Sequence, residues 1–347
     1  MENCPCKANC PNGCPCPDYY CPARILAINT WRNQSSTKKS FDRDLKVKLM
    51  ESPENKPMFF DYRGNTKALD MRIDNDTEVQ LSCSVVWEGN MYLYGGLQMT
   101  RQVSKVSDCY LSRIGNLSFE FRGGTCASVN NNKIYWCFTN VNDSSTDKIC
   151  YYSHDPLASE ISSLTSNYAH RYTRIAYGNG KLLTFTTVLY ATLGDILAVG
   201  STGPGNAQTE LLEVQTDTWS THQRYPFSSQ ISRFSMVYQD QKFFIIGGSS
   251  GSADGSDDQS RISQFSQRTK TWSEVGHLNV KRRGHGAIFD GVELVVIGGY
   301  EAHSIEHCTL TEGHFECFIT EQVKTYDFTN YVFYPELAII GGTFCDT

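Results

Sequence analysis

Four short hydrophobic runs of this chain end in a pair of glycines. They read MYLYGG at residues 91–96, FFIIGG at 243–248, VVIGG at 295–299 and LAIIGG at 337–342. The first glycines of the last three runs lie 51 and 43 residues apart, and 152 residues separate Gly95 from Gly247, about three intervals of that size. A strand that ends in Gly-Gly with a period of about 50 predicts one β-unit repeated around an axis.

Each repeat predicts four antiparallel strands. An apolar strand, a tight turn and a second apolar strand are indicated by RFSMVYQDQKFFIIGG (233–248) and by RGHGAIFDGVELVVIGG (283–299). A second hairpin follows in LLEVQTDTW (211–219) and ISQFSQRTKTW (262–272), with Trp219 and Trp272 expected to pack between adjacent units. The pattern indicates no amphipathic helix after residue 23.

The aliphatic strand before Gly-Gly, the following strand with Tyr or Phe, and the Trp of the fourth strand resemble kelch repeats over about residues 23–347. The resemblance implies an all-β, kelch-type β-propeller of six four-stranded blades. Their second strands would end at Gly96, Thr139, Gly200, Gly248, Gly299 and Gly342. Two repeats depart from the pattern, because KIYWCFT (133–139) has Phe138-Thr139 in place of the glycines and DILAVG (195–200) keeps one glycine.

One interval is too long for the repeat. Phe138 and Gly200 are 62 residues apart, and removing Lys181–Gly194 leaves 48. We expect this 14-residue segment to be an insertion at the rim, between the first two strands of the third blade. Two alternatives remain: Lys181–Phe185 is itself the second strand and Ile196–Gly200 is decoration, or the segment is an artefact of the gene model.

The ends of the chain predict how the ring closes. The sequence stops at Thr347, just after the second strand of its last blade. We expect RILAINTW (24–31) and KPMFFDY (56–62), within residues 23–80, to complete the blade begun by residues 330–342. Pairing of the two ends would remove two exposed sheet edges.

Residues 1–22 form a separate segment dense in Cys and Pro. Six of the 14 cysteines lie in the first 21 residues, which predicts a small disulfide-bonded segment. A metal cluster through Cys-x-Cys pairs is the alternative, although the segment has no His and no Cys-x2-Cys spacing. With this Cys-rich opening, the chain also resembles secreted kelch proteins of pelagic tunicates.

Cysteine and sequon content favour a secreted, extracellular glycoprotein. Four Asn-x-Ser/Thr sequons are glycosylation candidates, at Asn33, Asn75, Asn116 and Asn142. Residues 1–22 carry no apolar signal core, so either the chain is truncated at its N-terminus or export is unconventional. The predicted disulfides are Cys308–Cys317, Cys137–Cys150 and Cys109–Cys126, with cysteines placed in the third strands of three blades. Cys83 and Cys345 are left over as a staple for the closure.

Charge and hydropathy exclude two kinds of partner. The net charge of −6 gives no reason to expect nucleic acid or an anionic membrane surface as a ligand. The longest uncharged apolar stretch, Leu182–Gly194, has 13 residues, against the roughly 20 that a membrane-spanning helix needs. We therefore predict no nucleic-acid partner and no membrane span.

No motif in the sequence declares a reaction, a metal or a cofactor. The chain has no Gly-x-Ser-x-Gly elbow, no phosphate-binding Gly-rich loop and no His pair with acidic support. Resemblance to kelch-like propellers that are copper-radical oxidases gives the alternative function, but a ligand set is not identifiable. We predict a non-enzymatic binding or structural module that mediates interaction with proteins or glycans.

Three arginines recur at the start of first strands and are the candidate binding residues. Arg174, Arg233 and Arg283 lie 59 and 50 residues apart, which would place them near one mouth of the central channel. His285 belongs to the same stretch. An acidic or sulfated ligand would suit this set. The alternative is that each Arg bonds carbonyl groups of the neighbouring blade.

Overall fold

The structure is a computed structural model in which the chain is all-β. It describes residues 24–28, 58–60, 66–68, 72–74, 76–77, 82–88, 90–107, 110–129, 133–139, 147–170, 175–178, 195–200, 207–251, 257–289, 293–300, 302, 304–322 and 336–340. These residues contain 25 strands and no α-helix. The insertion segment Lys181–Gly194 and the Cys-rich residues 1–22 lie outside the described residues.

The strands form antiparallel sheets, which we number by their order along the chain. Sheet 1 contains β5 (Cys83–Trp87), β6 (Asn90–Tyr94), β7 (Gln102–Ser107) and β8 (Tyr110–Asn116). Sheet 2 contains β9 (Thr125–Val129), β10 (Lys133–Cys137), β11 (Ile149–Ser153) and β12 (Ser162–Thr165). Sheet 3 contains β13 (Ile175–Gly178), β14 (Asp195–Val199), β15 (Thr209–Glu213) and β16 (Thr218–Thr221). Sheet 4 contains β17 (Ser235–Gln239), β18 (Lys242–Ile246), β19 (Gln259–Ser266) and β20 (Trp272–Arg282). Sheet 5 contains β21 (Gly286–Phe289), β22 (Leu294–Ile297), β23 (Ser304–Thr311) and β24 (His314–Gln322). Sheet 6 contains β25 (Glu336–Ile340), β1 (Arg24–Ile28), β2 (Met58–Phe60) and β3 (Thr66–Ala68).

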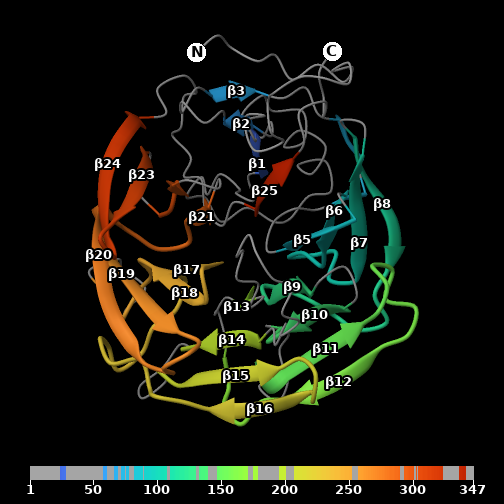
Figure 1. Ribbon diagram of the computed structural model, residues 1–347. Helices are drawn as coiled ribbons and strands as arrows, with labels where there is room; N and C mark the ends of the chain where they lie inside the picture. The colour runs from blue at the N-terminus through green and yellow to red at the C-terminus, as the bar shows by residue number, and fades with distance from the viewer. Residues whose placement is uncertain are drawn as a thin grey trace, which may run out of the picture.

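The sheets lie around a common centre (Figure 1). Their inner strands contact one another in the order β5, β9, β13, β17, β21, β25, and β25 also contacts β5. Two parallel contacts join outer strands: β20 pairs with β24 at Gly276 and Phe315, and the short β4 (Arg72–Ile73) pairs with β8. Sheets 4 and 5 are thereby continuous as one eight-stranded sheet.

Strands near the two ends of the chain pair, as the sequence predicts, but their order in the sheet differs from the prediction. β25, expected as a second strand ending at Gly342, is the inner strand, and β1, β2 and β3 follow it. β1 runs antiparallel to β25 over five residues, from Arg24 opposite Ile340 to Ile28 opposite Glu336. β2 pairs with β1 on its other side. β3, which the sequence pattern did not indicate, adds to β2. Strands from the start of the chain therefore extend the sheet that begins near its end.

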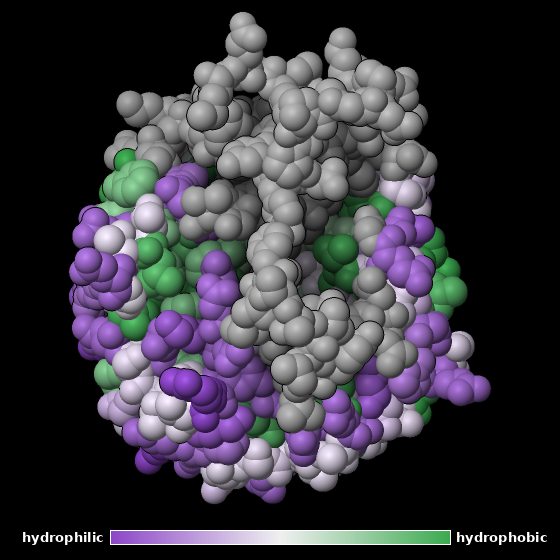
Figure 2. Space-filling model, in the orientation of Figure 1, coloured by the Kyte–Doolittle hydropathy of each residue, from purple (hydrophilic) through white to green (hydrophobic). Residues whose placement is uncertain are grey.

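The core consists of separate hydrophobic clusters, one in each gap between neighbouring sheets 1 to 5. Second strands are buried on both faces, so that their alternate residues serve two clusters. In β18, Phe243 and Ile245 pack against sheet 3, whereas Phe244 and Ile246 pack against sheet 5. This explains why second strands read as unbroken apolar runs while β12 and β16 are mainly exposed Ser and Thr. Figure 2 shows a largely hydrophilic lower rim, where β16 lies in Figure 1.

In sheets 1 to 5, the residue after the second strand has a left-handed backbone. Gly200 has φ +73°, and a Cβ there would lie 2.1 Å from the carbonyl oxygen of Ile231, so this position requires glycine. Phe138 stands at the same position of sheet 2 with φ +60°. Its ring packs 4.9 Å from that of His170 and 6.0 Å from that of Trp219. Phe138, which replaces glycine in this repeat, therefore adopts the left-handed backbone conformation that glycine has in sheets 1, 3, 4 and 5.

The strand before Gly200 is the second strand of its sheet. β14 pairs with β13 and with β15, as second strands do in the other sheets. The interpretation of Ile196–Gly200 as decoration is therefore wrong.

The tryptophan prediction is confirmed, because Trp272 of sheet 4 donates its indole N–H to Thr209 Oγ1 (3.2 Å) and the Gln223 carbonyl oxygen (3.0 Å) of the preceding unit.

Three disulfides lie among the described residues, and one corrects the predicted pairing. Cys137–Cys150 and Cys308–Cys317 form as predicted, each across neighbouring strands of one sheet. Cys126 bonds Cys83 rather than Cys109, with Cα atoms 5.9 Å apart. The prediction failed because residue 109 precedes β8, a fourth strand, whereas Cys83 and Cys126 lie on the adjoining inner strands β5 and β9. Cys83 is therefore not a staple to Cys345, which lies outside the described residues.

Candidate functional site

Two of the three candidate arginines meet at the boundary between sheets 4 and 5. Arg233 precedes β17 and Arg283 precedes β21. The carbonyl oxygen of Arg233 accepts a hydrogen bond from the N–H of Gly284 at 2.7 Å, so the starts of the two inner strands lie side by side. Arg174 lies outside the described residues. Arg233 is half-buried and has φ +56°.

Arg283 is buried, and its charge is already offset by a carboxylate. Its Nη1 lies 3.2 Å from Asp258 Oδ1, which belongs to the segment leading into β19. The guanidinium also lies 4.3 Å from the centre of the Tyr300 ring. Asp258 is itself buried, so this ion pair connects sheets 4 and 5 in a low-dielectric setting. Of the two described arginines, Arg233 is the one with more of its surface open to solvent.

His285 lies inside the packing between the same sheets. It is buried, and a Cβ at Gly247 would lie 2.9 Å from its Cε1. Its carbonyl oxygen accepts the Ser235 hydroxyl at 2.5 Å, which links the inner strands β17 and β21. The structure therefore places His285 where it contributes to the joint between sheets and not where it meets solvent.

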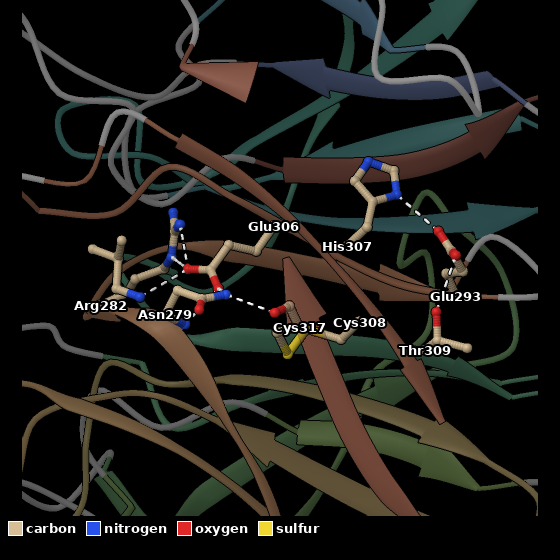
Figure 3. The surroundings of a disulfide bond; sticks show 9 residues. Asn279, Arg282, Glu293, Glu306, His307, Cys308, Thr309 and Cys317 are labelled. Carbon is tan, nitrogen blue, oxygen red and sulfur yellow. Dashed lines mark hydrogen bonds and ion pairs between the residues drawn. A yellow bond between two sulfur atoms is a disulfide. The ribbon is translucent and has the colours of Figure 1, made fainter. Parts of the chain in front are cut away.

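Sequence reasoning missed a fully buried ion pair beside this site (Figure 3). Arg282 uses all five guanidinium N–H donors: two go to Glu306 Oε1, at 3.2 and 2.7 Å, and one to the Gly298 carbonyl oxygen, at 2.8 Å. The other two go to the carbonyl and hydroxyl oxygens of Ser304, both at 2.7 Å. Burial lowers the pKa of the Arg282 guanidinium, and the carboxylate of Glu306 opposes that shift.

Glu306 receives three more hydrogen bonds from the end of β20, the last strand of sheet 4. Asn279 donates its backbone N–H at 2.6 Å and its side-chain amide at 3.1 Å to Oε2. Val280 donates its N–H to Oε1 at 3.1 Å. The Asn279 amide also reaches the Cys317 carbonyl oxygen at 2.8 Å, next to the Cys308–Cys317 disulfide. One carboxylate on the third strand thus holds the end of the preceding sheet through five hydrogen bonds.

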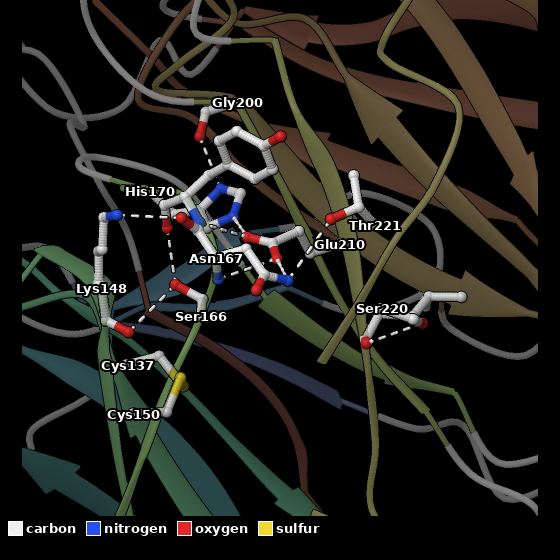
Figure 4. Close-up of polar contacts among 12 residues, drawn as sticks. Cys137, Lys148, Cys150, Ser166, Asn167, His170, Gly200, Glu210, Ser220 and Thr221 are labelled. Atoms are coloured by element: carbon white, nitrogen blue, oxygen red, sulfur yellow. Dashed lines mark hydrogen bonds and ion pairs between the residues drawn. A yellow bond between two sulfur atoms is a disulfide. The ribbon is translucent and has the colours of Figure 1, made fainter. Parts of the chain in front are cut away.

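At the joint between sheets 2 and 3, a buried glutamate on the third strand again accepts hydrogen bonds from the preceding sheet (Figure 4). Glu210 of β15 accepts the backbone N–H of Asn167 at 3.1 Å, its side-chain amide at 2.7 Å and the N–H of Tyr168 at 3.0 Å. His170 takes the place of the arginine: Nε2 lies 2.8 Å from Glu210 Oε2, and Nδ1 lies 2.8 Å from the Gly200 carbonyl oxygen. Burial acts to raise the pKa of Glu210, but its hydrogen bonds and the charge of His170 outweigh burial and hold that pKa below its ordinary value.

Two other joints between sheets have a neutral residue, Ser263 or Tyr151, on the third strand in place of the glutamate. Between sheets 3 and 4, the Tyr225 hydroxyl lies 3.1 Å from Ser263 Oγ. Between sheets 1 and 2, Phe119 stacks on Tyr151 with ring centres 4.0 Å apart. We call the two charged examples the carboxylate latches: Glu210 with Asn167, Tyr168 and His170, and Glu306 with Asn279, Val280 and Arg282. The sequence signal for them is Asn-x-x-His or Asn-x-x-Arg before a third strand that contains Glu.

Two histidines, at positions 303 and 307, lie four residues apart in the sequence. His307 donates its Nδ1–H to Glu293 Oε2 at 3.0 Å, and Thr309 donates its hydroxyl to Glu293 Oε1 at 3.1 Å (Figure 3). His303 lies outside the described residues. Within the described ranges, no group of three His, Cys, Asp or Glu side chains is arranged to hold a metal ion.

One glycosylation candidate can be placed. Asn116 is exposed at the end of β8, followed by buried Leu117 and exposed Ser118. Its side-chain oxygen accepts a hydrogen bond from Arg113. Asn33, Asn75 and Asn142 lie outside the described residues.

Comparison with known proteins adds no relative. No protein-family model matches the chain, and no curated protein matches it. In the part of the chain that the structure describes, no helix is long and apolar enough to cross a membrane.

Proposed function

We propose that this chain is a six-bladed propeller of the kelch kind that acts outside the cell as a non-enzymatic module, binding a protein or glycan ligand or serving as a structural component of matrix. The order of contacts among the inner strands carries the proposal. Each of the strands β5, β9, β13, β17, β21 and β25 contacts the next, and the last contacts the first. Repeated left-handed positions after the second strands support the same architecture.

Disulfide placement supports an extracellular setting. Cys83–Cys126 links the inner strands of two sheets, and Cys137–Cys150 and Cys308–Cys317 each link strands within a sheet. Disulfides persist in oxidising compartments and are reduced in the cytosol. A propeller cross-linked in this way gains stability against unfolding outside the cell, by about 2–4 kcal/mol for each bond.

The proposed ligand surface is the end of the ring where Arg233 enters sheet 4. Arg283 is paired with Asp258 and His285 is buried, whereas Arg233 keeps part of its surface open to solvent. Arg174 is the corresponding candidate outside the described residues. An acidic peptide or a sulfated glycan is the ligand chemistry that such positions would favour.

Immobilised heparin, as a sulfated glycan probe, tests this surface. Arg233→Ala should lower the salt concentration at which the protein elutes, because one guanidinium contact is lost. Arg268→Ala is the matched control, since Arg268 is exposed in the turn between β19 and β20, at the opposite end of sheet 4. Equal effects of the two substitutions would contradict the proposed surface. Stoichiometric copper with a Cys–Tyr cross-link in the purified protein would contradict the non-enzymatic proposal.

A further inference from the structure

Both ring nitrogens of His170 face oxygen atoms that accept hydrogen bonds. Its side chain is 0% exposed. Nδ1 faces the Gly200 carbonyl oxygen, which can only accept, so Nδ1 must donate. Nε2 faces Glu210 Oε2, which also accepts the Tyr168 N–H. Since the other oxygen of Glu210 accepts two donors from Asn167, the carboxyl group is surrounded by donors and is ionised.

We propose that His170 is held as an imidazolium, and that its positive charge makes the latch between sheets 2 and 3 sensitive to pH. The latch between sheets 4 and 5 is the comparison within the same molecule. Arg282 there makes the equivalent contacts, with the Gly298 carbonyl and with Glu306. A guanidinium keeps its charge at every pH that the protein survives, whereas imidazole titrates near neutrality in general.

Loss of the proton from His170 would leave one of its nitrogens as an acceptor facing another acceptor. Either the Gly200 carbonyl or the Glu210 carboxylate would then lie 2.8 Å from a lone pair, in a site without solvent. An unpaired buried carboxylate is costly. Relief comes from moving the short linker 166–170 away from Glu210. Deprotonation should therefore free the linker locally, while the hydrophobic cluster of sheets 2 and 3 stays packed.

Few charged groups face His170 from the elements packed against it. Glu210 comes from β15, and Asp147, whose carbonyl oxygen accepts the His170 N–H at 2.9 Å, precedes β11. Lys148 extends its Nζ to the Asn167 carbonyl oxygen at 2.9 Å. The remaining side is covered by the Phe138 ring. Glu210 alone makes an ion pair with His170 among the described residues, so the protonation of His170 decides whether the latch is neutral or carries a net negative charge.

Hydrogen–deuterium exchange measured on peptides covers both latches in one experiment. From about pH 6 to about pH 9, after correction for intrinsic exchange, protection at Asn167 and Tyr168 should fall about tenfold or more in the wild-type protein. Protection at Asn279 and Val280 should hold, because Arg282 keeps its charge. Parallel behaviour of the two latches over this range would overturn the proposal.

Reciprocal substitutions sharpen the test. His170→Arg should remove the pH dependence at Asn167 and Tyr168, and Arg282→His should introduce it at Asn279 and Val280. If neither variant folds, ¹⁵N-histidine NMR of the wild-type protein decides the matter. A buried ring with both nitrogens protonated at about pH 7 would support the imidazolium. If none of the eight histidine rings has both nitrogens protonated at that pH, the proposal is overturned.

Discussion

Removing the charge of Glu306 should destabilise the protein more than removing the charge of a surface glutamate on the neighbouring sheet. Glu306→Gln preserves the shape of the side chain but replaces one carboxylate oxygen with an amide NH2. In the place of Oε1 that group would face Arg282 and the Val280 N–H, and in the place of Oε2 it would face the Asn279 N–H, all of which are donors. Arg282 would be left buried without its counter-charge.

The expected loss is about 3–5 kcal/mol, the usual cost of removing one partner from a buried ion pair. Such a loss is a large part of the roughly 5–15 kcal/mol by which folded domains are stable. Glu274→Gln is the control, because Glu274 pairs with Arg261 at 2.6 Å on the partly exposed surface of sheet 4. An exposed pair contributes about 0–1 kcal/mol.

Urea unfolding with the disulfides intact measures both free energies on the same scale. The account predicts a clear gap between the two variants. A Glu306→Gln protein that unfolds within about 1 kcal/mol of Glu274→Gln would refute the reasoning, since the buried carboxylate would then not hold the joint.

Three further changes have definite expected outcomes. Gly200→Ala should cost about 1–3 kcal/mol in urea unfolding, because the new Cβ meets the Ile231 carbonyl oxygen and the backbone is left-handed. The folded-state pKa of Glu210 lies below its ordinary 4.5, so its stabilisation is complete above that pH and is lost as pH falls through the folded-state value; Glu210→Gln should lack this acid-side dependence of the free energy of unfolding. Replacing Cys308 and Cys317 together by Ser should lower the thermal midpoint through a loss of about 2–3 kcal/mol, and an unchanged midpoint would show that this bond adds nothing.

Local sequence signals predicted the strands well because the physics that produces them is local. Second strands lie between two neighbouring sheets, so both of their faces are apolar, and the run ending at Gly247 could be recognised without a structure. Hairpin turns could also be predicted from the sequence. At the turn between β17 and β18, Asp240 and Gln241 both have positive φ, as a two-residue turn of this kind requires. The disulfide across the β23–β24 hairpin followed from the same local geometry.

Contacts between sheets were not predictable in the same way. Cys83 and Cys126 meet because two inner strands adjoin, and their separation of 43 residues gives no hint of this. Glu210 and His170 look like solvent-facing residues in the sequence, yet both are fully buried since the fold brings them together from two sheets. The burial of the candidate His285 was equally hidden, because its position in the repeat could not show that it packs against Gly247 of the neighbouring sheet.

Mass spectrometry of the unreduced protein from its native source tests the central claim most directly. An extracellular, disulfide-linked propeller predicts linked peptides for Cys83–Cys126, Cys137–Cys150 and Cys308–Cys317, together with a glycan on the exposed Asn116. Free thiols at these six cysteines with an unmodified Asn116 would contradict both the extracellular setting and the cross-linked ring.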